Sequence, residues 1–231
     1  MYLLRVRVSL SPLGCPRSEA DDWRISRPWM GMAERLSGGN VALALLANAL
    51  ATSGALLALI LAFGPISGAH FNPAVTLVDR FFGTITTKET ILYMVAQVAG
   101  GCIGAVVANV MFELDPISLS TTSRSSGALW LSEVIATIGL LLVIHGCVRT
   151  NRAAAVPFAV GIWIGGAYWF TSSTSFANPA VTVSRTLSDS FAGIKPSSAP
   201  MFIVMQLIGA CLAFALIRFL YPRAIEEAGD V

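Results

Sequence analysis

The chain has 231 residues, of which 55% are apolar and only 12% are charged, and its formal net charge is +2. A soluble domain carries about 25% charged residues, so this composition excludes an ordinary soluble globular protein and is typical of an integral membrane protein. A net charge this small gives no argument for a nucleic-acid partner. We therefore expect a chain surrounded by a lipid bilayer and no bound nucleic acid.

The first 40 residues contain no segment able to cross a membrane. Their apolar runs are short, and six arginines interrupt them: Arg5, Arg7, Arg17, Arg24, Arg27 and Arg35. Each arginine inside a membrane costs at least about 2.5 kcal/mol on insertion scales. A crossing helix needs about 20 mainly apolar residues. The membrane-spanning part of the chain is therefore predicted to begin after residue 40.

Five apolar stretches follow, each long enough to cross the hydrocarbon core of a bilayer. They are Val41–Phe63, Ile91–Phe112, Leu129–Val148, Ala153–Phe170 and Met201–Leu220. Charged, Pro-rich or Ser-rich stretches separate them. The third stretch contains one acid, Glu133. A carboxylate inside a membrane is a functional candidate by default.

The loops between these stretches differ in basic charge. One set holds six basic residues, Arg80, Lys88, Arg149, Arg152, Arg218 and Arg223. The alternate set holds three, Arg124, Arg185 and Lys195. Cytoplasmic loops are enriched in Arg and Lys, so the first set is predicted to be cytoplasmic. The tail at 222–231 then also lies in the cytoplasm.

The pentapeptide Asn-Pro-Ala-Val-Thr occurs twice, at 72–76 and at 178–182, each time after an apolar stretch. Asn is a favoured helix N-cap and Pro suits the first helical position, so each copy predicts a helix start. The predicted helices run from Asn72 to about Phe82 and from Asn178 to about Leu187. Ten residues rise about 15 Å, half the hydrocarbon core. Because the copies enter from opposite sides, they predict a site near the midplane of the membrane.

Irregular backbone at the midplane is tolerated only where it lines a water-filled cavity or is buried in protein, so the two motifs are expected to line such a passage. The motif residues are Asn72, Pro73, Ala74, Asn178, Pro179 and Ala180. Each Asn can cap its helix through its oxygen and still donate through its NH2 group. Two helix N-termini add about half a positive charge each, so neutral solutes pass whereas protons and cations are excluded. We expect passive passage and therefore no enzyme, no cofactor and no metal.

The segment "SGAHFNPAVTL" at 67–77 and the second "NPAVT" at 178–182 resemble the two characteristic motifs of the aquaporin, or major intrinsic protein, family. The likeness implies an all-α membrane protein, an aquaporin-like helix bundle with inverted repeats. Five full transmembrane helices and two re-entrant half-helices are expected, with the first family helix missing. It also implies a multi-pass channel for water and small neutral solutes, present as a homotetramer in a bacterial inner membrane.

The resemblance implies a selectivity filter nearer the outer mouth. Counting without gaps from the two Asn residues places it at Thr52, Gly166, Ser175 and Val181. Most of the family has arginine where Val181 stands, and Arg185, one turn further along, is a candidate replacement. The chain therefore resembles a bacterial aquaglyceroporin-like member lacking the pore arginine. A wide, uncharged and mildly polar filter is expected, which favours glycerol-like polyols, urea or neutral metalloid hydroxides such as arsenous acid.

We also expect particular locations or roles for three further residues. By family likeness, Glu133 holds loop backbone N–H groups and His70 faces the cytoplasmic vestibule. His145 has no motif around it, and we expect it to be a packed or interfacial residue.

The likeness covers about residues 32–221, predicted to be the channel domain, whereas 1–31 are atypical. A mispredicted start or a shifted reading frame is the favoured interpretation of 1–31, with a true five-span variant and a targeting segment as alternatives. If the first span is lacking, one wall of the pore is open, so a non-conducting family member is one alternative function. A secondary transporter, which also uses inverted repeats and broken helices, is the other alternative.

Overall fold

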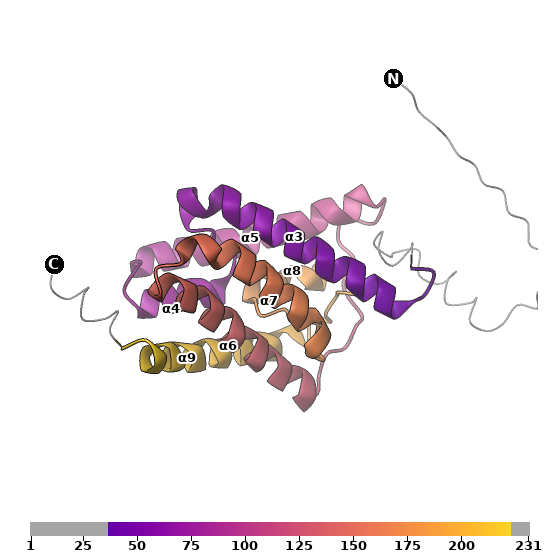
Figure 1. The fold of residues 1–231 in the computed structure, drawn as a ribbon. Coiled ribbons are helices and arrows are strands. Elements are labelled where there is room, and N and C mark those ends of the chain that lie inside the picture. Colours follow the sequence, from indigo (N-terminus) through magenta and orange to yellow (C-terminus); the bar gives the residue numbers. More distant parts are fainter. Residues whose placement is uncertain (1–36, 223–231) are drawn as a thin grey trace, which may run out of the picture.

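The structure, a computed structural model, describes residues 37–222 (Figure 1). The atypical segment 1–31 and residues 223–231 of the predicted tail lie outside the described residues. Every regular element within 37–222 is helical. The helices are α3 (Val41–Ser67), α4 (Pro73–Phe81), α5 (Thr87–Met111), α6 (Gly127–Arg149), α7 (Val156–Phe170), α8 (Pro179–Ser184) and α9 (Ala199–Leu220), with the 3₁₀ turns η2 (Ala153–Ala155) and η3 (Arg185–Leu187).

Five of these elements are long and apolar enough to cross a membrane, namely α3, α5, α6, η2 with α7, and α9. They confirm the five predicted spans. Two boundaries shift by four residues: α5 begins at Thr87 and not at Ile91, and α3 passes the expected end at Phe63 and continues through Pro65 to Ser67. Proline removes one hydrogen bond from the last turn. The helix ends only at Gly68, whose φ of 71° reverses the chain as a left-handed cap.

The short helices α4 and α8 are the half-helices that the two pentapeptides predict. In each of them an extended Asn caps the helix and Pro occupies the first turn. The prolines and the alanines that follow are buried, namely Pro73, Ala74, Pro179 and Ala180. In Figure 1 both short helices lie among the long ones. The short helices are therefore enclosed by the bundle.

The loops that lead into α4 and α8 share an unusual backbone conformation. Ala69 and Phe71 both have φ of 46°, and Ser175 and Ala177 have φ of 50° and 47°. These are the third and the first residues before the capping Asn in each copy. The left-handed region costs a non-glycine residue about 1–2 kcal/mol. The same cost at the same two positions shows that the two loops are structural repeats of each other.

Glycines allow neighbouring long helices to pack closely against one another. A Cβ added to Gly139 of α6 would lie 1.8 Å from the ring of Trp163 in α7. A Cβ added to Gly165 of α7 would lie 2.3 Å from the hydroxyl of Ser53 in α3. These contacts fix how α7 is rotated against its two neighbours, and so which of its side chains face the interior.

Candidate functional site

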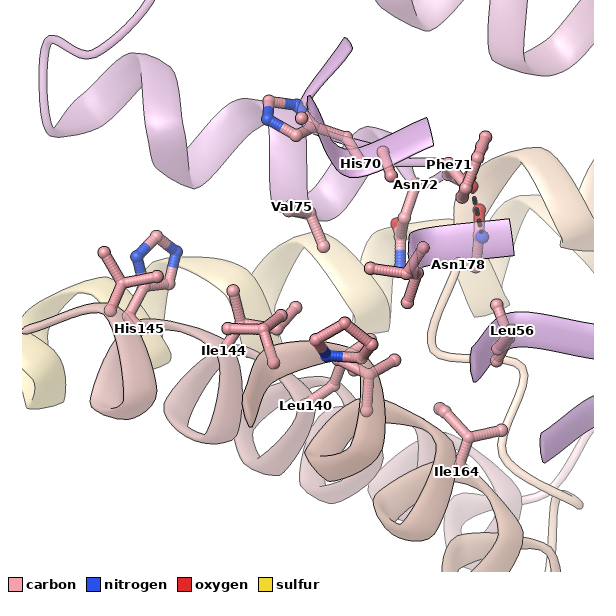
Figure 2. Close-up of a pocket in the computed structure, with 18 of the residues that line it drawn as sticks. Leu56, His70, Phe71, Asn72, Val75, Leu140, Ile144, His145, Ile164 and Asn178 are labelled. Carbon is pink, nitrogen blue, oxygen red and sulfur yellow. Dashed lines mark hydrogen bonds between the residues drawn. The ribbon is translucent and has the colours of Figure 1, made fainter. Parts of the chain in front are cut away.

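Asn72 and Asn178 join the two half-helices at the centre of the bundle. Each side-chain oxygen caps its own helix by accepting from the N–H two residues on, at 2.9 and 3.0 Å. Asn72 Nδ2 donates to the carbonyl of Ala177 at 2.7 Å. Asn178 Nδ2 donates to the carbonyl of Phe71 at 2.8 Å, the bond drawn dashed in Figure 2. Each amide therefore ties its own helix to the loop that precedes the other helix.

A cavity of about 1030 Å³ runs past both amides. One side carries polar groups and is formed by residues 68–72 together with Asn178. The other side is apolar and comes from α3, α6 and α7, with Leu56, Ile60, Leu140, Ile144, Val160 and Ile164. Figure 2 shows the two amides facing Leu140 and Ile144 across this space. The cavity can therefore offer hydrogen-bond donors to one edge of a small molecule and hydrocarbon to the other.

Three of the four predicted filter residues line this cavity, namely Thr52, Ser175 and Val181. Gly166 does not. Helix α7 presents Tyr168 there instead. Two residues correspond to about 200° of rotation around a helix, so Gly166 and Tyr168 lie on opposite faces. The count without gaps therefore does not give the lining residue of α7, because helix packing and not sequence distance sets the rotation of that helix.

Arg185 also lines the cavity, at the end that the charge pattern predicts to be outside. Its Nη2 donates to Tyr168 Oη at 2.9 Å, and that oxygen shares a 3.1 Å hydrogen bond with Thr52 Oγ1. Its guanidinium carbon lies 4.4 Å from the ring centre of Phe176. The wall therefore carries a positive charge here, whereas the count predicted an uncharged filter. The signal in the sequence was only that Arg185 follows Val181 by one turn.

Glu133 holds the loop before α8 from the third span. Its carboxylate is fully buried. It accepts from the backbone N–H groups of Phe176 at 3.0 Å and Ala177 at 2.8 Å. It also accepts from Ser173 Oγ and from Gln206 Nε2, both at 2.6 Å. Buried charges require this kind of full hydrogen bonding, so Glu133 shapes the loop that carries the second motif.

Arg124 joins the loop before α8 to the loop after η3, although the sequence suggested only a loop charge. Its guanidinium is buried and donates to the carbonyls of Gly193 at 2.8 Å, Ser173 at 3.1 Å and Phe191 at 3.2 Å. Burial lowers the pKa of Arg124 to about 10. The side chain therefore keeps its charge at neutral pH, and its fork spans three loop carbonyls that a point charge could not reach together.

A polar cluster occupies the opposite end of the cavity. His70 Nε2 lies 2.9 Å from Asp79 Oδ2, and its Nδ1 shares a 3.2 Å hydrogen bond with Thr76 Oγ1. His145 Nε2 lies 3.8 Å from Asp79, beyond hydrogen-bond distance. His145 is buried, but it faces the cavity (Figure 2) and is not only a packing residue as expected. Within residues 37–222, no group of three or more His, Cys, Asp or Glu side chains could hold a metal ion.

The sequence profile of the family described as major intrinsic protein matches residues 28–175 and 149–230. The chain belongs to this family. It is 47% identical over 193 residues to "Aquaglyceroporin AqpS" of Rhizobium meliloti, with 84% of this chain and 82% of the relative aligned. It is 31% identical to "Probable aquaporin AqpM" of Archaeoglobus fulgidus over 72% of each chain. It is 32% identical to "Aquaporin NIP1-1" of Zea mays, over 71% of this chain and 60% of that one.

As a major intrinsic protein, the chain is a multi-pass membrane protein and a channel for water and small solutes, not an enzyme. The resemblance drawn from the two pentapeptides is thereby confirmed, as is the all-helical membrane fold. The geometry of the two amides and of the cavity beside them is therefore the basis for proposing which solutes this channel passes.

Proposed function

We propose that this major intrinsic protein passes glycerol-like polyols, urea and neutral metalloid hydroxides such as arsenous acid, as well as water, and excludes protons and cations at its paired Asn-Pro-Ala motifs. The observation that carries the proposal is the two-sided cavity. Its polar side offers the amides of Asn72 and Asn178, and its opposite side is hydrocarbon. A small polyol has the same two edges, one of hydroxyls and one of carbon, and fits such a lining without leaving polar groups unpaired.

Proton exclusion follows from the amides and the helices that they cap. Each NH2 group has two N–H bonds and uses one on the carbonyl of the opposing loop. The second N–H is free to meet a passing oxygen. The N-termini of α4 and α8 add about half a positive charge each. A water held this way turns its oxygen to the donors, which breaks the chain of waters along which a proton would move.

The size of the solute follows from the outer wall. Val181 lines the cavity where most of the family has arginine, so position 181 itself adds no long cationic side chain, and the positive charge at this end comes from Arg185. Thr52 and Ser175 add small polar groups. The relative that is 47% identical is named an aquaglyceroporin. Together these observations support solutes larger than water.

Measurements of solute flux test the proposal. The full chain is reconstituted into liposomes, and stopped-flow light scattering follows water, glycerol, urea and arsenous acid, with protein-free liposomes as the control. We expect rates for all four solutes that exceed the control at least tenfold. Fast water with no glycerol or arsenous acid flux would contradict the solute class. Absence of all flux would favour the non-conducting alternative, and flux that requires a proton gradient would favour a secondary transporter.

We also propose a homotetramer in a bacterial inner membrane with one pore per subunit. The 18-residue apolar window of α5 has none of its residues buried within the single chain. Such a face requires lipid or another subunit beside it. Native mass spectrometry of the detergent-solubilised protein tests the assembly, with a mass of four chains expected and a monomer contradicting it.

A further inference from the structure

We infer that Arg185 and Tyr168 form the selectivity constriction of this channel, with Arg185 as its cation barrier and Tyr168 as the residue that sets its width. The inference rests on the proposed function, because it assumes that neutral solutes use the cavity. It differs from the filter that the sequence suggests in two ways. The charge comes from position 185 and not from 181, and α7 contributes Tyr168 and not Gly166.

A chain of hydrogen bonds lines the outer end of the cavity. It runs from Thr52 of α3 through Tyr168 of α7 to Arg185 beyond α8, with links of 3.1 and 2.9 Å. All three residues line the cavity. Three elements that are distant in sequence are thus joined at one end of the cavity. A solute that enters here must pass this chain or separate its members.

The guanidinium reaches this level from one turn further along the helix. Arg185 begins the 3₁₀ turn η3, which continues α8, four residues after Val181. Long side chains on a helix point back toward its N-terminus, which brings the charged group toward the level of Val181. The ring of Phe176, 4.4 Å from the guanidinium carbon, and the bond to Tyr168 hold it there. The charge is therefore fixed in position before a solute arrives.

Two polar atoms at this constriction lack partners. Arg185 Nη1 and Ser175 Oγ are covered by neighbouring atoms and make no hydrogen bond within the described part of the chain. Buried polar atoms almost always have partners. A neutral solute that separates the side chains here could give both atoms a hydrogen bond, since Nη1 donates and a hydroxyl donates or accepts. A cation could not, because the fixed guanidinium repels it.

Arg124 shows why the role belongs to Arg185. Both guanidinium carbons lie over the ring of Phe176, at 5.0 and 4.4 Å. Arg124, however, donates hydrogen bonds to three loop carbonyls and does not line the cavity. It is a structural brace, whereas Arg185 presents its charge to the passage.

The test compares R185M, R185K and Y168F with the original chain in liposomes. R152M is the matched control, because Arg152 is exposed and does not line the cavity. Potassium flux and the ratio of sorbitol to glycerol permeability are measured. We expect R185M to raise potassium flux at least tenfold and the sorbitol ratio at least fivefold. Y168F should raise the sorbitol ratio by a similar factor without potassium flux, and R185K should keep potassium out.

The outcomes separate this inference from the proposed function. If the original chain passes neither water nor glycerol, the proposed function is wrong and the inference falls with it. If the original chain passes glycerol and R185M matches it within twofold in both readouts, the inference alone is wrong. If R185M does not fold, Y168F and R185K decide: an unchanged sorbitol ratio in Y168F overturns the role of Tyr168, and potassium flux through R185K overturns the role of the charge.

Discussion

Asn72 and Asn178 each donate to the carbonyl of the residue that precedes the other, at 2.7 and 2.8 Å. The two half-helices are thus linked at their N-termini by a reciprocal pair of hydrogen bonds. The same side chains cap the helices, so one residue type fixes both the start of each helix and the position of the other. Ser or Asp would cap these helices equally well. Only an amide both caps its own helix and donates a hydrogen bond to the loop before the other one.

Replacing Asn178 by Asp should separate these two roles. The carboxylate still caps α8, but it cannot donate to Phe71, and it adds a negative charge at the midplane. We expect the free energy of unfolding to fall by about 0.5–1.5 kcal/mol because the Phe71 carbonyl, which is not buried, loses the hydrogen bond from Asn178, and we expect potassium to leak. Thermal unfolding in detergent and liposome flux measure both. Asn40→Asp is the control, because Asn40 is exposed and caps α3; equal effects of the two changes would contradict the prediction.

Replacing Glu133 by Gln should distort the loop before α8. The carboxylate accepts four hydrogen bonds in a fully buried position. An amide in its place turns a donor toward groups that are themselves donors. We expect a loss of at least about 1–3 kcal/mol in unfolding free energy and reduced glycerol flux. Glu113→Gln, at an exposed loop position, should change neither, and an E133Q protein as stable as E113Q would refute this account.

The threonine of each repeated motif accepts a hydrogen bond from a glutamine of a long helix, so the two glutamines can be compared directly. Gln206 Nε2 donates to Thr182 Oγ1 and to Glu133, whereas Gln97 Nε2 donates to Thr76 Oγ1 alone, both threonine links being 2.9 Å. Gln97 Oε1 is buried without a partner in the described structure. Replacing Gln206 by Leu should therefore lower the melting temperature more than replacing Gln97 by Leu, by the equivalent of about 1–3 kcal/mol. Differential scanning fluorimetry of both variants checks the order, and the reverse order would contradict it.

Helix packing gives a prediction that is independent of the cavity. Gly139→Ala would place a methyl group on the ring of Trp163, whereas the same change at Gly104 meets open space. Overpacking of this kind costs about 1–3 kcal/mol. In contrast, Gly→Ala at an exposed helix position is neutral or stabilising. Thermal unfolding should thus show a loss for G139A only. A G139A protein that melts with the original chain would mean that α6 and α7 adjust freely.

Local signals in the sequence predicted the elements well. The dipeptide Asn-Pro favours a capped helix start, and a long apolar stretch indicates a membrane span. Thr52, Ser175 and Val181, which counting from the motifs gives as filter positions, line the cavity, and their role as a filter stays a prediction. Gly166, counted in the same way, does not line the cavity, because the rotation of α7 depends on its contacts with α3 and α6. No count along the chain contains that information.

Charged and polar side chains were harder to place. Arg124 counted only as a loop charge, because its three carbonyl partners lie 49 to 69 residues away in sequence. Tyr168 gave no signal, since an aromatic residue near the end of a span is expected in any membrane helix. His145 was visible as the one histidine in an apolar stretch, but its facing Asp79 required the fold.

The two walls of the passage are braced to different degrees. The α8 side is locked by Glu133, Gln206 and Arg124 together, and every contact in that group is internal to the described chain. On the α4 side Gln97 repeats the part of Gln206, but no carboxylate among residues 37–222 repeats that of Glu133. One wall is therefore stiff and the other compliant. Fluctuations in the width of the passage should therefore begin at α4. A further helix that placed a carboxylate beside Gln97 would make the two walls equally rigid.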